Sequence, residues 1–189
     1  MVAVLGLLFA LLGNAVSPRG LRLTRDYFPG QSRPAPIRPS NPGAQQSADQ
    51  AQAVAASLQK LGLQAARSNE VAQLFSDPRY QQGLVIFIDA RSDHAFQAGH
   101  IPGAWQLDHY HPEKFLPTVM PLCLTAEQII VYCTGGDCED SEFAAITLRD
   151  AGIPAQKLFV YTGGIKEWTN QMPFEVGERG SGTIHQAGK

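Results

Sequence analysis

The residues best suited to covalent chemistry lie in one short segment that begins with a cysteine. Its members, in order, are Cys133, Thr134, Gly135, Gly136, Asp137, Cys138, Glu139, Asp140 and Ser141. Consecutive glycines let backbone N–H groups turn inward as an anion-binding nest, and a helix N-terminus adds partial positive charge. Both effects favour the thiolate form of a nearby cysteine, which is its nucleophilic form. We therefore predict that Cys133 is a nucleophile at the start of a site-forming loop.

The elements that must position this loop follow an α/β pattern. Apolar runs at residues 84–88, 128–132 and 157–161 predict strands that are buried on both faces. Shorter strands are expected at residues 63–65 and 104–107, and helices at residues 49–61, from Ser68 or Asn69 onward, at residues 93–98 and 141–151, and after Gly163-Gly164. Strands that alternate with helices predict a central parallel β-sheet flanked by helices on both faces.

Ligands of open parallel sheets bind beyond the carboxyl ends of the strands. Three loops leave such ends here, at residues 89–91, 133–140 and 162–164. We expect these loops to meet at one edge of the sheet and to form the site there.

The chain divides into five parts by composition. These are an apolar segment with a basic flank at residues 1–28, a proline-rich linker at 29–50, helices leading into the main domain at 51–82, the main domain at 83–177, and a flexible C-terminal tail at 178–189.

Residues 2–16 are almost wholly apolar, although the run is shorter than the roughly 17 residues that a membrane-spanning helix needs. They fit a short membrane anchor or a signal peptide cleaved after Ala15, with a buried core helix as the third alternative. Positive charge follows the run and none precedes it; the arginines are Arg19, Arg22, Arg25, Arg33 and Arg38. We expect membrane association through this segment, with the domain cytoplasmic if the segment is uncleaved and exported if it is cleaved.

Four motifs resemble those of the rhodanese-like sulfurtransferase family. They are Ile-Asp-Ala-Arg at residues 88–91, Ala-Gly-His-Ile-Pro-Gly-Ala at 98–104, Val-Tyr-Cys at 131–133, and Gly163-Gly164 followed by Trp168. The resemblance covers residues 83–177 and implies a parallel α/β domain whose cysteine holds sulfane sulfur as a persulfide. Cys133 matches that cysteine by position. Asp89, Arg91 and His100 match framework positions of the family, so a structural role is expected for them, in support of the loop.

The loop departs from the family pattern at one position. Active members often have Cys-x-x-Gly-x-Arg, and here Cys138 stands where the arginine would be. The loop is also longer and acidic, with Asp137, Glu139 and Asp140. These acids suit the first turn of a helix, and they also repel anionic substrates such as thiosulfate.

The leading interpretation is a sulfurtransferase or persulfide carrier that needs a sulfur donor and a thiol acceptor but no cofactor. One alternative is a thiol redox element in which Cys133 and Cys138 form a reversible disulfide. Another is a binding module that has lost turnover. A cysteine phosphatase would clamp phosphate with an arginine, and residues 134–141 contain none, which argues strongly against that class.

Composition and the remaining polar clusters argue against other classes. The net charge of −2 gives no basic footprint for nucleic acid, and three cysteines do not suggest a disulfide scaffold.

The run Asp108-His109-Tyr110-His111 follows a predicted strand and is expected at the same edge as Cys133. Its spacing fits no familiar zinc pattern, so we predict no metal site, and we interpret Cys123 as a packing residue.

Overall fold

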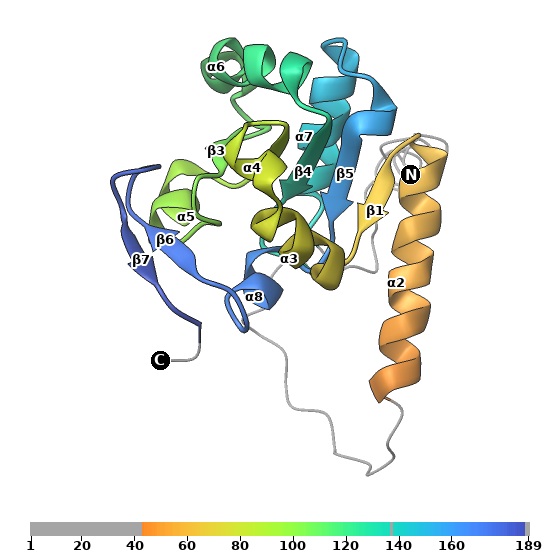
Figure 1. Ribbon diagram of the computed structural model, residues 1–189. Coiled ribbons are helices and arrows are strands. Elements are labelled where there is room, and N and C mark those ends of the chain that lie inside the picture. The colour runs from red at the N-terminus through yellow and green to blue at the C-terminus, as the bar shows by residue number, and fades with distance from the viewer. Residues whose placement is uncertain (1–42, 137, 188–189) are drawn as a thin grey trace, which may run out of the picture. The chain divides into compact units, whose positions relative to one another are not determined.

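The computed structural model describes residues 43–136 and 138–187, with side chains from residue 52 onward. Five parallel strands form its central sheet, in the order β1-β5-β4-β2-β3. Their bounds are β1 Gln64–Ala66, β2 Val85–Asp89, β3 Trp105–Gln106, β4 Gln128–Tyr132 and β5 Leu158–Tyr161. The predicted α/β fold with a central parallel sheet is confirmed, and β1, the short strand predicted at residues 63–65, lies at an edge of the sheet (Figure 1).

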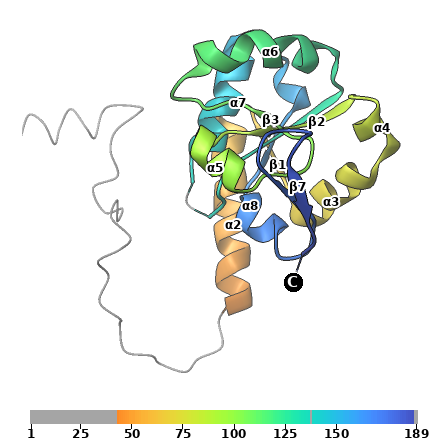
Figure 2. The same cartoon turned by 90° about the vertical axis from the view of Figure 1, so that its left-hand side faces the viewer.

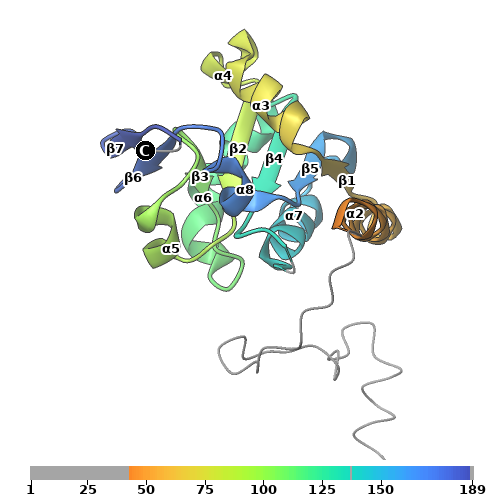
Figure 3. The ribbon, with the colours of Figure 1, turned by 90° about the horizontal axis from the view of Figure 1, so that it is seen from below.

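Helices cover both faces of this sheet. One face packs against α2 Gly43–Lys60, α6 Pro112–Thr125 and α7 Asp140–Asp150, and the other against α3 Ser68–Ser76, α4 Pro78–Gln81 and α8 Gly164–Trp168. Seen along the sheet, α3 and α4 lie on one side and α2 and α7 on the other (Figure 3). The remaining helical elements are α5 Asp93–Ala98 and a 3-10 turn at Ala155–Lys157.

Side chains alternate along β4 and the residue after it, so successive residues pack on opposite faces of the sheet. Ile129, Val131 and Cys133 belong to the core on the α7 side, whereas Ile130 and Tyr132 belong to the core on the α8 side. A strand that is buried on both faces must be apolar throughout, which is why the continuous run was recognisable.

A second, two-stranded antiparallel sheet follows α8. It pairs β6 Phe174–Val176 with β7 Thr183–His185, and it joins the rest of the domain through a bridge between His100 and Glu175. Figures 1 and 2 show this hairpin beside α5. The expectation of a flexible tail at residues 178–189 was therefore wrong, because β7 lies within it.

Several predicted boundaries also differ. The first helix begins at Gly43 rather than near Asp49, so the linker assigned to residues 29–50 extends too far. The last proline of this predicted linker is Pro42, and the alanine and glutamine residues that follow it favour a helix. Because β1 pairs with β5, the main sheet already starts before residue 83. The cap of α3 is Arg67, not Ser68 or Asn69, and its backbone N–H donates to the Glu70 carboxylate at 2.9 Å.

The expected apolar segment at residues 1–28 lies outside the described residues. Within the part of the chain that the structure describes, no helix has the length and apolar character needed to cross a membrane.

Candidate active site

Cys133 follows the last residue of β4, near the middle of the sheet. The carboxyl ends of the neighbouring strands are in register with it, since Tyr132 lies beside Asp89 of β2 and Tyr161 of β5. The three loops that leave these strands therefore meet at one edge, as predicted. The Cys133 residue is 1% exposed, so its sulfur lies beneath the loop rather than on it.

The contacts of the Cys133 sulfur come from the loop and from α7. Cys133 and Cys138 form a disulfide, with their Cα atoms 6.5 Å apart. This confirms the expectation that the two cysteines can pair. The Ser141 hydroxyl donates to Sγ of Cys133 at 3.4 Å, and the Cys138 carbonyl oxygen lies 3.3 Å from the same sulfur. Ser141 is a buried residue in the first turn of α7, so its hydroxyl is held in place.

A second glycine-containing loop holds the first one in position. The Ile165 N–H donates to the Cys133 carbonyl at 2.9 Å, and the Lys166 N–H donates to the Thr134 carbonyl at 3.3 Å. These N–H groups lie at the start of α8. Because they already donate to carbonyls of the cysteine loop, they are not available to bind an anion. The Gly136 N–H likewise donates to the Thr162 carbonyl at 3.3 Å. Part of the N–H nest that was expected from the glycines is therefore occupied by hydrogen bonds within the fold.

Glycine is required at this crossing of loops. Gly164 has a φ of +58°, and a Cβ there would lie 2.6 Å from the Cys133 carbonyl oxygen and from the Thr134 carbonyl carbon. A Cβ on Gly135, whose φ is +93°, would overlap the Gly163 carbonyl oxygen. The need for glycine at positions 135 and 164 thus has a steric cause, the close approach of two backbones.

Asp89 and Arg91 form a buried ion pair beneath the site. Arg91 donates from Nε to Oδ1 at 2.9 Å and from Nη2 to Oδ2 at 2.6 Å, and Nη2 also donates to the Gly99 carbonyl at 2.6 Å. Burial alone would lower the pKa of Arg91, but the interactions with Asp89 and Tyr132 together outweigh it and the pKa is raised. Both residues have the contacts of framework groups, and the guanidinium is committed to Asp89 and Gly99.

His100 is also fixed within the framework. Its ring is fully buried and stacks on Phe96 with centroids 3.8 Å apart, and its Nδ1 lies 3.0 Å from the Phe96 carbonyl. Its Nε2 lies 3.2 Å from a carboxylate oxygen of Glu175.

Glu175 is a buried glutamate that sequence reasoning missed. Its carboxylate accepts hydrogen bonds from the N–H groups of Gly103, Gly180 and Gly182. Burial alone would raise the pKa of Glu175, but these donors and His100 together lower it. Through these hydrogen bonds, Glu175 links the β6–β7 hairpin to the loop after α5.

The run that begins at Asp108 lies at the rim of the site. His109 Nε2 lies 4.0 Å from Oδ1 of Asp140, and its ring contacts Tyr110 and Phe143 at centroid distances of 3.8 and 5.3 Å. The expected position near the cysteine loop is thus observed, whereas His111 is exposed and lies near Glu113. No group of three metal-ligating side chains converges among the described residues.

The charged residues of the loop itself are all acidic. Residues 134–141 include no lysine or arginine, and Glu139 and Asp140 stand at the N-terminus of α7. Asp137, which was also expected in this loop, lies outside the described residues. Because Arg91 is paired with Asp89, it does not supply the missing cation.

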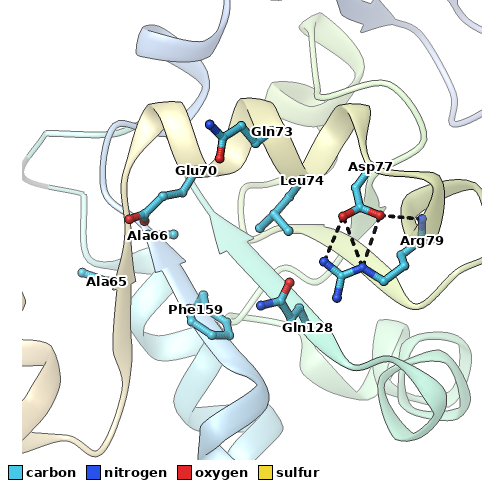
Figure 4. A pocket seen from close by; sticks show the side chains of 9 residues that line it. All are labelled: Ala65, Ala66, Glu70, Gln73, Leu74, Asp77, Arg79, Gln128 and Phe159. Atoms are coloured by element: carbon cyan, nitrogen blue, oxygen red, sulfur yellow. Dashed lines mark hydrogen bonds and ion pairs between the residues drawn. The ribbon is translucent and has the colours of Figure 1, made fainter.

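A pocket of about 430 Å³ lies elsewhere in the domain, between α3 and the strands β1, β4 and β5 (Figure 4). It is lined by Ala65, Ala66, Glu70, Gln73, Leu74, Asp77, Arg79, Gln128 and Phe159. Cys133 is not among these residues, and the Arg79 guanidinium in it is already bound by Asp77 at 2.9 Å. The pocket is therefore separate from the cysteine loop.

Comparison with known proteins places residues 68–171 in the rhodanese-like domain family. Over 90 residues, the chain is 32% identical to an HTH-type transcriptional regulator of Mycobacterium tuberculosis, with 48% of this chain and 37% of that protein covered. Similar solved structures include a thiosulfate sulfurtransferase from Pseudomonas aeruginosa, at 20% identity and a TM-score of 0.47, covering 68% of this chain and 23% of that one. Another is the rhodanese-like domain of an Anabaena protein, at 18% identity and a TM-score of 0.43, covering 65% and 78%. Since the family match spans more than half of the chain, the protein belongs to the rhodanese-like domain family.

Proposed function

We propose that this domain is a sulfurtransferase or persulfide carrier that accepts sulfane sulfur on Cys133. The observation that supports this most strongly is the placement of Cys133 at the carboxyl end of β4, beneath a glycine loop that α8 holds in position. A thiol at this edge of a parallel sheet stands where substrates of such folds bind.

The proposed reaction has two nucleophilic steps. The Cys133 thiolate attacks the outer sulfur of a donor persulfide, the sulfur–sulfur bond of the donor breaks, and the donor leaves as a thiolate. An acceptor thiolate then takes the outer sulfur from Cys133. This is covalent catalysis, in which one transfer becomes two easier ones. The Ser141 hydroxyl, 3.4 Å from Sγ, can donate to the thiolate in both steps.

The charges at the loop favour donors that are not anions. Thiosulfate is a dianion, and Glu139 and Asp140 stand at the helix start beside the loop. One unfavourable charge pair at about 4 Å costs roughly 1 kcal/mol in water and about 4 kcal/mol near a protein surface. We therefore expect neutral or weakly charged persulfides to be better donors than thiosulfate.

Intact mass spectrometry of the reduced protein after incubation with a persulfide donor tests the proposal. The expected result is a mass increase of one sulfur atom that maps to Cys133 and is absent from Cys133→Ala. Cys123→Ala is the matched control, because Cys123 is buried in α6 and its pKa is raised to about 12 by burial. A rhodanese-like domain that folds normally but never gains sulfur would refute the proposal and favour an inert binding module.

A second candidate is a thiol redox element, which the Cys133–Cys138 disulfide favours. In that case the disulfide would be reduced and reoxidised without any bound sulfane sulfur. The same mass measurement on Cys138→Ala separates the two, because a sulfur carrier keeps the added sulfur on Cys133 in this variant, whereas a redox element gains none.

A further inference from the structure

We infer that Cys138 is the resolving nucleophile of this site: it attacks the persulfide on Cys133, expels sulfide, and leaves a disulfide that an external dithiol reductant reopens. The inference rests on the proposed function, because it begins from a Cys133 persulfide. It assigns a product, hydrogen sulfide, and the class of the second co-substrate, a dithiol that reduces the disulfide and takes up no sulfane sulfur.

The first support is that the two sulfurs are within bonding reach without any rearrangement of the sheet. The Cα atoms of Cys133 and Cys138 are 6.5 Å apart, inside the range of about 4.4–6.8 Å that disulfides require. Gly135 and Gly136 have φ values of +93° and +69°, and these left-handed residues turn the chain so that Cys138 returns over Cys133.

The second support is the position of the loop between fixed elements. Its start is held by the Ile165 and Lys166 N–H groups, and its end enters α7, whose buried Ser141 contacts the Cys133 sulfur. With both ends fixed, Cys138 is confined near Cys133, which makes attack on the persulfide intramolecular. Even short flexible linkers give effective concentrations in the mM range.

The third support is the difference in exposure between the two sulfur-bearing residues. Cys133 is 1% exposed in the disulfide, whereas Cys138 is only partly buried. In the disulfide form, an external reductant therefore reaches Cys138 more readily than Cys133. Attack there releases Cys133 as the leaving thiolate, which the Ser141 hydroxyl can stabilise by donating a hydrogen bond.

The atoms and electrons balance across the cycle. The Cys138 thiolate attacks Sγ of the Cys133 persulfide; the bond between Sγ and the outer sulfur breaks, and the outer sulfur leaves as HS⁻. The two cysteines are oxidised to a disulfide while the sulfane sulfur is reduced to sulfide. A dithiol then attacks Cys138, forms a mixed disulfide, and closes to its own disulfide, which restores both cysteine thiols.

The test follows single-turnover sulfide release from the full chain. Reduced protein is loaded with a small persulfide donor and freed of excess reagent, and sulfide, free thiols and intact mass are followed. The wild type should release one sulfide per loaded site and lose two thiols, and peptide mapping should find the new disulfide between Cys133 and Cys138. Cys123→Ala should behave like the wild type.

Cys138→Ser should gain the sulfur but keep it. With external thiol at about 10 µM, its release should be about a hundredfold slower than in the wild type, since the intramolecular attack acts at an effective concentration of about 1 mM. Cys138→Ala should show the same retention, which guards against a defect specific to serine.

Each outcome has one meaning. If neither the wild type nor a Cys138 variant gains sulfur, the proposed function fails. If the wild type gains sulfur and either both Cys138 variants release it at the wild-type rate or neither variant gains any, the proposed function stands and the resolving role of Cys138 is overturned. A disulfide mapped to Cys123 would also overturn that role.

Discussion

Replacing Arg91 with methionine tests whether this cation is part of the framework or of the substrate site. The change removes the guanidinium and keeps a long apolar side chain. Asp89 is fully buried and accepts from Nε, from Nη2 and from the Arg91 backbone N–H, the last at 3.0 Å. Of these three Arg91 donors, only the backbone N–H survives the substitution.

The expected cost follows from the charge that is left behind. Removing one partner of a buried ion pair typically costs about 3–5 kcal/mol, because the remaining charge is uncompensated. The Arg91 side chain is 9% exposed and that of Asp89 is 0% exposed, so solvent offers little relief. We therefore expect Arg91→Met to lower the free energy of unfolding by about 3–5 kcal/mol. Asp89→Asn in the same background should recover part of this loss, with a coupling of about 1–3 kcal/mol.

Urea unfolding of the reduced protein at neutral pH measures these values. Arg79→Met is a matched control, because Asp77 and Arg79 have the same spacing and a similar multidentate contact, but their side chains are 27% and 40% exposed. That change should have a far smaller effect on stability. A loss of less than about 1 kcal/mol for Arg91→Met, well below the range for a broken buried pair, together with loss of sulfur uptake from thiosulfate, would refute the framework role and assign Arg91 to the substrate.

Three further changes have defined outcomes. Gly164→Ala should lower the free energy of unfolding by more than about 3 kcal/mol, since left-handed strain of about 1–2 kcal/mol adds to overlap with the Cys133 and Thr134 carbonyls. Gly62→Ala, at a φ of +74° with open space around it, should lose only the strain, so equal losses in urea unfolding would contradict the steric account. The pKa of Glu175 is lowered in the fold, so its stabilising contribution is present above its usual value of 4.5 and is lost as the pH falls below it. The stability difference between wild type and Glu175→Gln should shrink through that range, and a difference independent of pH would argue against this. Finally, Cys138→Arg should speed sulfur uptake from thiosulfate at least about fivefold relative to the neutral Cys138→Gln, because one favourable charge pair contributes about 1 kcal/mol even in water. Equal uptake by these two variants in intact mass measurements would show that loop charge does not limit this donor.

The elements that place Cys133 were predictable from the sequence. The runs that became β2, β4 and β5 are apolar throughout, because each strand is covered on both faces, and α5 was predicted with its observed bounds. The glycine pairs marked the two loops whose backbones approach each other. These are local signals, and a single sequence contains them.

Other parts depend on contacts between distant residues. The helix α6 contains Pro117 and Pro121, which disfavour a helix locally, and it forms because Val119 and Cys123 pack into the core. The pairing of His100 with Glu175 joins positions 75 residues apart, so the sequence around either residue gives no local signal of this contact. For the same reason β7, which pairs with β6, was assigned to a tail.

The backbone bond from Ile165 to Cys133 makes one amide of α8 a reporter on the cysteine loop. This N–H belongs to a residue that is 8% exposed, and its acceptor is the carbonyl of the proposed nucleophile itself. Its hydrogen exchange with solvent therefore requires that the two loops separate, whatever the state of the sulfurs. If the reduced, persulfidated and disulfide forms exchange this amide at the same slow rate, the chemistry takes place within a closed backbone. Faster exchange in one form would identify the step at which the loops part.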